Sequence, residues 1–241
     1  MPSSGFWSML MLSMSEDSPL RVALISANLG SFDTVVEHCE QKLPYGVELT
    51  VKRFTDDNFP PRSCAMTPRL QARIPKMFGW DMVPLHDYYI WVDASCALLH
   101  EESVAWFLKK VEHADIAVFK HPDRNSIREE YLFIKSKIEE GNKYITRRYK
   151  NELLSEQYEV IKQDRFFFDN KLYASTAFIY HNVAQVRQML REWWVHTSRY
   201  HSVDQLALPY VLEKSFCKVN VIEDNYLKCP YLTYTRNLRV S

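Results

Sequence analysis

The sequence predicts an α/β fold in which helices flank a mostly parallel central sheet, and three observations support this prediction. Short apolar runs, rich in β-branched and aromatic residues, recur along the chain as expected for buried strands. Amphipathic stretches with helical spacing separate these runs. Several runs stop at polar residues, as strands do where a ligand crevice opens at their carboxyl ends. Strands that alternate with helices in this way form parallel sheets covered on both faces.

The composition is that of an ordinary globular protein. With 241 residues, of which 46% are hydrophobic and 25% charged, the chain is long enough for one large domain. We expect residues 1–18 to form a flexible leader and residues 19–241 to form this single domain. Lys plus Arg and Asp plus Glu both number 30, so the net charge favours neither nucleic acid nor an anionic membrane as a partner.

The cysteines and an apolar N-terminal stretch bear on localisation. The five cysteines are scattered and lack the CxxC spacing of zinc or redox sites, which indicates a reducing compartment. We therefore expect a cytoplasmic protein. Residues 6–12 ("FWSMLML") are far shorter than the roughly 20 residues that span a bilayer and follow no basic stretch. They leave peripheral membrane contact open.

The first predicted elements are two strands around a helix. Residues 21–28 ("RVALISAN") form a compact apolar run, and residues 47–54 ("VELTVKRF") alternate as a half-buried strand does. Between them, residues 34–43 ("TVVEHCEQKL") have helical spacing and predict a helix.

A helix is predicted over residues 67–80, with Thr67 as N-cap and Pro68 at its first position. Pro75 should end or kink this helix, because proline lacks the backbone N–H and clashes with the preceding turn. Residues 126–163 are highly charged and predict two solvent-facing helices with a break near Gly141. The remaining strands are predicted at residues 88–92, 115–122, 171–182 and 217–223, and the remaining helices at residues 101–114, 183–200 and 202–214.

One strand ends directly on a carboxylate. Residues 88–92 are apolar and Asp93 follows them, in the stretch "DYYIWVDASCALL". Because ligands bind outside the carboxyl ends of strands in open α/β sheets, an acid there can face a ligand while the residues behind it stay buried. The triplet "DAS" by itself is also compatible with a helix cap or a turn.

Several linked motifs together resemble a known family. "RLQARIPKM", "YYIWVDAS", "DIAVFKHPDR", the pair "EE" at residues 129–130 and "DQLALPYVL" resemble, in order and spacing, uncharacterised-domain family 616, whose members are glycosyltransferase-like. The likeness covers roughly residues 21–225.

The resemblance implies a GT-A-like single domain with a Rossmann-like nucleotide-binding half. It also implies transfer of a hexosyl or deoxyhexosyl group from a nucleotide diphosphate sugar, with uridine the expected base, to a hydroxyl of a glycan, lipid or protein. "DAS" is similar to the Asp-x-Asp motif of such enzymes, in which oxygen ligands hold a divalent ion against the diphosphate.

A metal site is expected on this motif. Mn²⁺ and Mg²⁺ prefer oxygen ligands, and an ion that also binds two phosphate oxygens needs few from the protein. Asp93 would be the main ligand and Ser95 a weaker or water-mediated one, with Ala94 between them at the donor. Many GT-A relatives have a late His ligand, but no His follows His201 here. Either Asn225 or a nearby group substitutes, or the phosphates complete the site, or no metal is used.

The ends of the first two strands are candidates for nucleoside binding. Backbone groups around Ala27, Asn28 and Gly30 could face the base, with Gly30 permitting close approach. Thr55 and Asp56 follow the second strand, where doubly wound folds often place an acid on a ribose hydroxyl. A simple turn and a solvated loop are the alternatives.

Basic residues could hold the diphosphate. Arg69, Arg73 and Lys76 share one side of the predicted helix, since positions four apart are neighbours, and Arg binds phosphate with a planar fork. Solvent-facing charges are the alternative. His121 and Arg124 follow a strand end and could contact phosphate or donor sugar. Glu129 and Glu130 open a helix whose positive end favours acids, so we expect them to cap it.

Asp204 is the candidate catalytic residue. With Gln205, a further donor-binding candidate, it heads an apolar helix, and in the resembling enzymes a carboxylate here lies beside the reacting sugar. Asp204 could act as general base in an inverting reaction or stabilise an oxocarbenium-like sugar in a retaining one. Helix capping together with Ser202 is the alternative. We expect His201 to be an ordinary surface residue.

Two other functions stay open at this point. A nucleotidyltransferase also places acids near a metal in an α/β fold. A non-catalytic nucleotide-sugar-binding module is compatible with "DAS", which has one acid where stricter enzymes have two.

Overall fold

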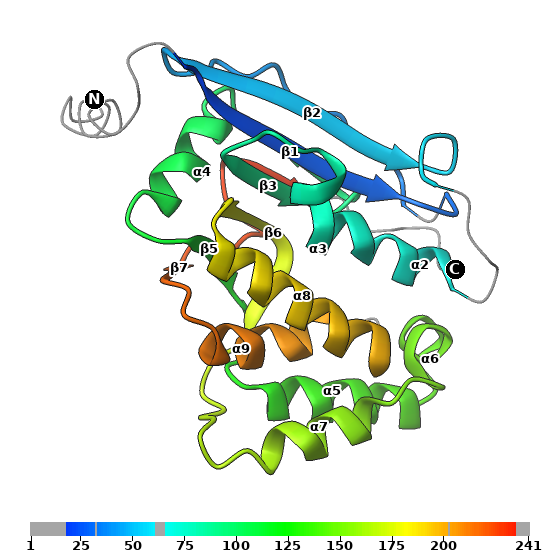
Figure 1. Ribbon diagram of the computed structural model, residues 1–241. Coiled ribbons are helices and arrows are strands. Elements are labelled where there is room, and N and C mark those ends of the chain that lie inside the picture. Colours follow the sequence, from blue (N-terminus) through cyan, green and yellow to red (C-terminus); the bar gives the residue numbers. More distant parts are fainter. Residues whose placement is uncertain (1–17, 32, 61–65, 202, 235–241) are drawn as a thin grey trace.

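The computed structural model describes residues 18–31, 33–60, 66–201 and 203–234 (Figure 1). The predicted leader, apart from Ser18, lies outside the described residues, as does "FWSMLML" at residues 6–12. No helix within the described ranges is long and apolar enough to cross a bilayer.

The core of the protein is a six-stranded sheet with the order β2-β1-β3-β6-β5-β7. All neighbouring pairs are parallel except those of β6, which runs antiparallel to β3 and β5. This confirms the predicted α/β class with a mostly parallel sheet. The strands are β1 (Leu20–Asn28), β2 (Val47–Thr55), β3 (Tyr88–Val92), β5 (Ile116–Lys120), β6 (Tyr173–His181) and β7 (Val219–Ile222).

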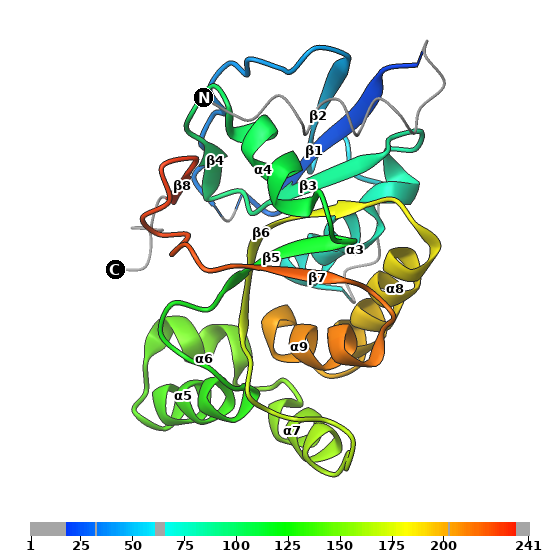
Figure 2. The same cartoon turned by 90° about the vertical axis from the view of Figure 1, so that its left-hand side faces the viewer.

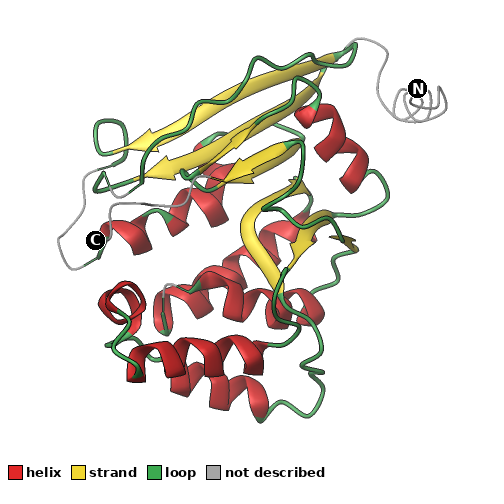
Figure 3. Ribbon diagram, turned by 180° about the vertical axis from the view of Figure 1, so that it is seen from behind, coloured by secondary structure: helices red, strands yellow, loops and turns green. Residues whose placement is uncertain are grey.

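Helices cover both faces of this sheet. On one face α3 (Arg73–Met82), α8 (Ala184–Arg199) and α9 (Asp204–Lys214) pack together against β1, β3 and β6. On the other face lies α4 (Ser103–Val111). Seen from behind, the sheet and the helices beside and below it separate clearly (Figure 3).

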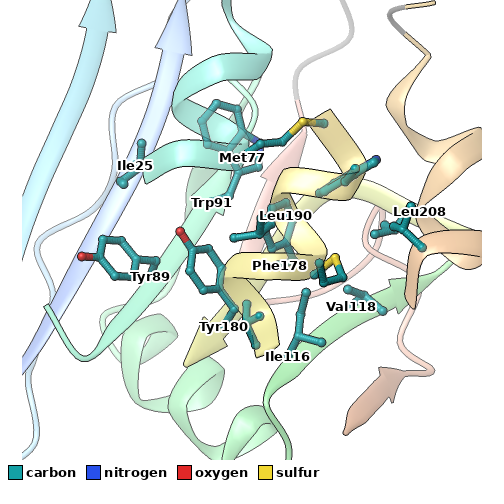
Figure 4. Close-up of a cluster of buried hydrophobic side chains, with 14 of the residues drawn as sticks. Ile25, Met77, Tyr89, Trp91, Ile116, Val118, Phe178, Tyr180, Leu190 and Leu208 are labelled. Atoms are coloured by element: carbon teal, nitrogen blue, oxygen red, sulfur yellow. The ribbon is translucent and has the colours of Figure 1, made fainter. Parts of the chain in front are cut away.

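Alternation along the strands creates these two cores. In β3, Tyr89 and Trp91 face the α3 side, whereas Ile90 and Val92 face the α4 side. Figure 4 shows the first core, in which Trp91 lies near Met77 and Tyr89 stacks beside Tyr180. The centre of the sheet is therefore buried on both faces, and Asp93 comes next after the four buried residues Tyr89 to Val92.

Residues 34–43 do not form the predicted helix. They run without regular structure beside β4 (Cys96–Leu98), where the backbone N–H of Cys39 donates to the carbonyl of Leu98 at 3.0 Å. The backbone N–H of Leu98 in turn donates to Nδ1 of His38 at 3.1 Å. The helix prediction was wrong: the backbone N–H groups of Cys39 and Lys42 donate to the distant carbonyls of Leu98 and Glu101 and not to carbonyls within a helix. The other side of β4 pairs with β8 (Leu232–Tyr234).

The helix predicted over residues 67–80 is broken. Thr67 caps α2 (Pro68–Gln71) as predicted, accepting from the backbone N–H of Leu70 at 3.2 Å. The break lies at Ala72, before α3, because a proline at position 75 clashes with the carbonyl four residues earlier. Pro75 therefore kinks the segment and does not end it.

The charged region after β5 holds three helices and not the predicted two. They are α5 (Ile127–Glu139), α6 (Lys143–Tyr149) and α7 (Leu154–Lys162). Gly141, with a φ of +73°, ends α5 where expected. The additional break separates α6 from α7 and lets both helices pack against α5. In Figures 1 and 2 these helices form a layer below the sheet.

Candidate functional site

A cavity of about 230 Å³ opens at the carboxyl ends of β1 and β3. Its walls come from the α2–α3 segment, α5, α6, β6 and the start of α9. Nine of the candidate residues line it: Ala27, Asn28, Arg69, Arg73, Asp93, Ala94, Ser95, Asp204 and Gln205. The fold thus places a crevice where the sequence predicts one.

Lys76 joins Asp93 to Asp204, and Arg73 is a second cation paired with Asp204. Lys76 Nζ lies 2.6 Å from Oδ2 of Asp204 and 3.4 Å from Oδ1 of Asp93. Arg73 Nε lies 3.2 Å from the same oxygen of Asp204. We call these four residues the charge cluster. It ties the end of β3, helix α3 and the start of α9 to one another.

Lys76 is the most deeply buried member of the charge cluster. Its side chain is fully enclosed, and its ammonium lies 5.6 Å and 5.7 Å from the ring centres of Trp91 and Trp193. A buried ammonium needs both anionic partners and the ring faces around it, because desolvation of a charge is costly. Lys76 does not line the cavity, so the predicted direct contact with the donor is not supported by its position.

Asp204 is held from several sides. The hydroxyl of Ser175 donates to its Oδ1 at 2.9 Å. Burial by itself would raise the pKa of Asp204, but Arg73, Lys76 and Ser175 lower it to about 2. Val203 occupies the N-cap position of α9, and Ser202 lies outside the described residues. At neutral pH, Asp204 is therefore a carboxylate whose charge is already matched by cations.

Arg69 presents unsatisfied donors inside the cavity wall. Its guanidinium stacks 4.3 Å from the ring centre of Tyr149, and Nη1 donates to the carbonyl of Arg148 at 3.5 Å. Its Nε and Nη2 are buried and have no hydrogen-bond partner in the described part of the chain. Burial lowers the pKa of Arg69. Because buried polar groups are normally paired, these donors indicate an anionic ligand.

Asp93 lies where β3 meets the cavity. Its Oδ1 accepts from Nε1 of Trp91 at 2.8 Å, and its backbone N–H donates to the carbonyl of Thr176 in β6 at 2.8 Å. Its carbonyl accepts from the backbone N–H of Cys96 in a turn. Asp93 does not cap the next helix, because the N-cap position of α4 is Glu102. Asp93 therefore belongs to a turn and also lines the cavity, and of the two alternatives only the helix cap is wrong.

Glu130 is a cavity residue that the sequence analysis assigned elsewhere. Ser126 caps α5, and Glu129 accepts from the backbone N–H of Asn125 at 2.7 Å. Glu130 is instead buried in the cavity wall, where it pairs with Nε of Arg124 and accepts from Nε2 of Gln205 at 2.5 Å. Burial raises its pKa, while Arg124 and Gln205 oppose that rise. The capping prediction is confirmed for Glu129 in the turn and wrong for Glu130.

Comparisons with known proteins identify the family. Residues 64–238 match the family described as TOD1/MUCI70, glycosyltransferase-like domain. The chain belongs to this family. The glycosyltransferase-like character expected from the motifs is confirmed at this level.

A solved structure is also similar to the TOD1/MUCI70 domain. It is the crystal structure of S. aureus TarS, residues 1–349, with a TM-score of 0.44 and 10% sequence identity. The match covers 89% of this chain and 60% of the TarS chain. None of the curated proteins compared matches the sequence.

Other candidates support the site from outside its lining. The backbone N–H of Gly30 donates to the Asp56 carboxylate at 3.0 Å, which fixes the turn after β1, and Thr55 precedes this acid at the end of β2. Nδ1 of His121 accepts from the backbone N–H groups of Asp123 and Arg124 at 3.2 Å and 3.1 Å. Burial and the Arg124 charge lower the pKa of His121 to about 4. None of these residues lines the cavity of the TOD1/MUCI70 domain, so their predicted contact with a donor is not supported by their position.

His201 is not the surface residue that was expected. It is buried, and its Nδ1 accepts from the backbone N–H of Val203 at 3.2 Å. Burial is the main reason that its pKa falls to about 3. A single histidine in a sequence does not reveal such burial.

The metal expectation fits the residues only in part. The described ranges contain no group of three or more His, Cys, Asp or Glu side chains that could hold an ion. Oδ1 of Asp93 already faces Trp91 and Lys76, which leaves its Oδ2 and the hydroxyl of Ser95 as oxygen ligands. Oδ1 of Asn225 accepts from the backbone N–H of Leu227. These groups suit an ion that arrives with phosphates and keeps its own waters, as Mg²⁺ commonly does.

Proposed function

We propose that this TOD1/MUCI70 domain transfers a sugar from a nucleotide diphosphate sugar, with uridine the expected base, to a hydroxyl of a glycan, lipid or protein. The observation that carries this proposal is Arg69, whose buried Nε and Nη2 have no partner in the described chain and lie in the wall of the cavity at the strand ends. The family match supports it independently.

The diphosphate would bind on the arginine side of the cavity. Arg69 offers a planar fork suited to phosphate oxygens. Donors already aimed at the place where negative charge develops stabilise a departing diphosphate without reorganisation. Ala27 and Asn28 line the same cavity at the end of β1, where a base would be held by backbone groups.

A divalent ion would be held by Asp93 and Ser95. When bound, Mn²⁺ or Mg²⁺ would supply further neutralisation of the diphosphate. Lys76 supplies a fixed positive charge beside Asp93 whether or not an ion binds, at 3.4 Å from its Oδ1.

Asp204 fits an orienting role better than that of a general base. A carboxylate with a pKa of about 2 accepts a proton poorly near neutral pH. Its ion pairs with Arg73 and Lys76 instead keep these cations in place. We infer that Asp204 acts by fixing the charge cluster and stays ionised through the reaction.

A donor-hydrolysis assay tests the proposal. The full chain is incubated with UDP-sugars and Mn²⁺, and free UDP is measured separately from pyrophosphate. Release of UDP is expected, and release of pyrophosphate would indicate the alternative nucleotidyltransferase. Arg69→Ala should lower kcat/KM by roughly 100-fold, the scale of one lost transition-state donor. Arg128→Ala, an exposed arginine of α5, is the matched control.

Two outcomes would contradict the proposal. If Arg69→Ala and Arg128→Ala turn over at the same rate, Arg69 does not hold the diphosphate. If wild type and Asp93→Ala both bind UDP-sugars without releasing UDP, the domain is a binding module.

A further inference from the structure

A chain of three polar side chains runs along the wall made by α5 and the start of α9. Nε of Arg124 pairs with Oε2 of Glu130, and Nε2 of Gln205 donates to Oε1 of Glu130 at 2.5 Å. Glu130 is only 4% exposed, and both Glu130 and Gln205 line the cavity. Helix capping does not explain this chain, since Ser126 already caps α5.

The contact with Glu130 fixes the orientation of the Gln205 amide. A carboxylate paired with arginine accepts hydrogen bonds and donates none. The group of Gln205 that faces Glu130 is therefore its NH₂, and its carbonyl oxygen points away from Glu130. Both oxygens of Glu130 are used in these contacts. Of these three side chains, Gln205 is thus the one whose carbonyl oxygen is an oriented hydrogen-bond acceptor at the cavity.

Apolar side chains of α5 belong to the same wall of the cavity. Phe133 and Ile134 line the cavity beside Glu130, and the guanidinium of Arg124 lies 4.2 Å from the ring centre of Phe133. A wall that combines an aromatic ring with a fixed hydrogen-bond acceptor suits a sugar, which has an apolar ring face and hydroxyl donors. A diphosphate, which has only acceptor oxygens, is poorly matched to a carbonyl backed by a carboxylate.

We propose that the Gln205 carbonyl is the subsite that accepts a hydrogen bond from a hydroxyl of the transferred sugar, with Glu130 and Arg124 as positioning residues. This inference rests on the proposed function and assigns the sugar end of the donor. The acceptor carbonyl selects neutral hexoses over hexuronic acids, because it can accept a hydrogen bond from a hydroxyl but meets only acceptor oxygens on a carboxylate.

Calorimetric titration of the full chain with UDP, UDP-glucose, UDP-galactose and UDP-glucuronic acid tests the subsite. In wild type, at least one neutral UDP-hexose should bind more tightly than UDP, and UDP-glucuronic acid should not. Gln205→Met keeps the side-chain length without the amide, and Glu130→Gln removes the charge that orients it. Both should lose roughly 10-fold in affinity for the hexose donor, the scale of one hydrogen bond in a charged network.

Affinity for UDP separates a sugar subsite from general structural damage. Both variants should bind UDP as wild type does, whereas a misfolded cavity would lose UDP as well. Glu129→Gln makes the same chemical change at the neighbouring exposed position and should keep the hexose preference. Gln205 is partly exposed, so Gln205→Met remains informative if Glu130→Gln does not fold.

Three results would overturn the inference. The first is a hexose preference that survives in both variants, and the second is an equal loss for UDP and UDP-hexose in both. The third is a wild-type protein that binds UDP and every UDP-hexose alike, which leaves the nucleotide site intact. A wild type that binds neither UDP nor any UDP-sugar contradicts the proposed function itself.

Discussion

Replacing Lys76 with Met should destabilise the domain strongly. The ammonium is completely buried, 2.6 Å from Asp204 and 3.4 Å from Asp93. Met fills the space of the side chain but leaves Asp204 in the interior with Arg73 as its remaining cation. Removing one partner of a buried ion pair costs about 3–5 kcal/mol. Since Arg73 stays, we expect a loss near the lower end of this range.

The loss can be measured by thermal and urea unfolding. At about 2–4 °C per kcal/mol for a domain of this size, the melting temperature should fall by roughly 6–12 °C. Lys109→Met on the exposed side of α4 is the matched control and should change stability by less than about 0.5 kcal/mol. The reasoning is refuted if Lys76→Met melts within about 2 °C of wild type, the effect of a minor surface change.

A double-mutant cycle shows whether the loss comes from the uncompensated carboxylate. Asp204→Asn removes the charge that Lys76→Met leaves unpaired. The double variant should therefore be less destabilised than the sum of the two single variants, because residues in one buried network are coupled. Additive losses would assign the effect to packing around Trp91 and Trp193 instead.

Further predictions concern backbone strain and acid stability. Gly30→Ala and Gly46→Ala both force alanine into a positive φ, but only at Gly30 would the new Cβ meet Pro68, at 2.9 Å. Gly46→Ala should lower the free energy of unfolding by about 1 kcal/mol. Gly30→Ala should lower it further and should also weaken UDP-sugar binding, as measured by urea unfolding and calorimetric titration. Equal effects of the two variants would contradict this prediction. The lowered pKa of Asp204 gives stability that is present above its ordinary pKa of 3.8 and is lost as pH falls toward about 2, worth about 2 kcal/mol in total. The pKa of His201 is about 3 in the folded protein, so only the unfolded protein takes up its proton near pH 6.5. Stability should therefore fall as pH drops from 6.5 toward 3, and unfolding curves of His201→Gln should show a less steep fall, since His121 still contributes.

Much of the sheet could be predicted because its central strands are buried on both faces. The apolar runs at β1 and β3 predict buried strands, and a charge that follows such a run marks the end of the strand. The position of Asp93 at a crevice could therefore be predicted from the local sequence. The start of α2 could likewise be predicted, because Thr67 is a favoured N-cap residue and Pro68 is favoured at the first helical position.

The errors lie where long-range contacts decide the structure. Residues 34–43 have helical spacing, yet His38 and Cys39 bond to Leu98 of β4, some 60 positions away. Glu130 and Arg148 come from a charged region whose helices are placed by packing against α9 and α2, which no local pattern encodes. The spacing of Glu130 with Ile127 and Ile134 on one face of α5 was the signal available for its burial.

The pairing of β4 with β8 connects the last described strand to the turn that contains Asp93. Leu232 and Leu98 are register partners, and Cys96, only three positions after Asp93, pairs with Tyr234. Removing residues 232–234 would take away the strand that pairs with β4, just beyond the Asp93 carboxylate in the cavity. Expression designs for biochemistry on this domain should therefore leave that far end untouched.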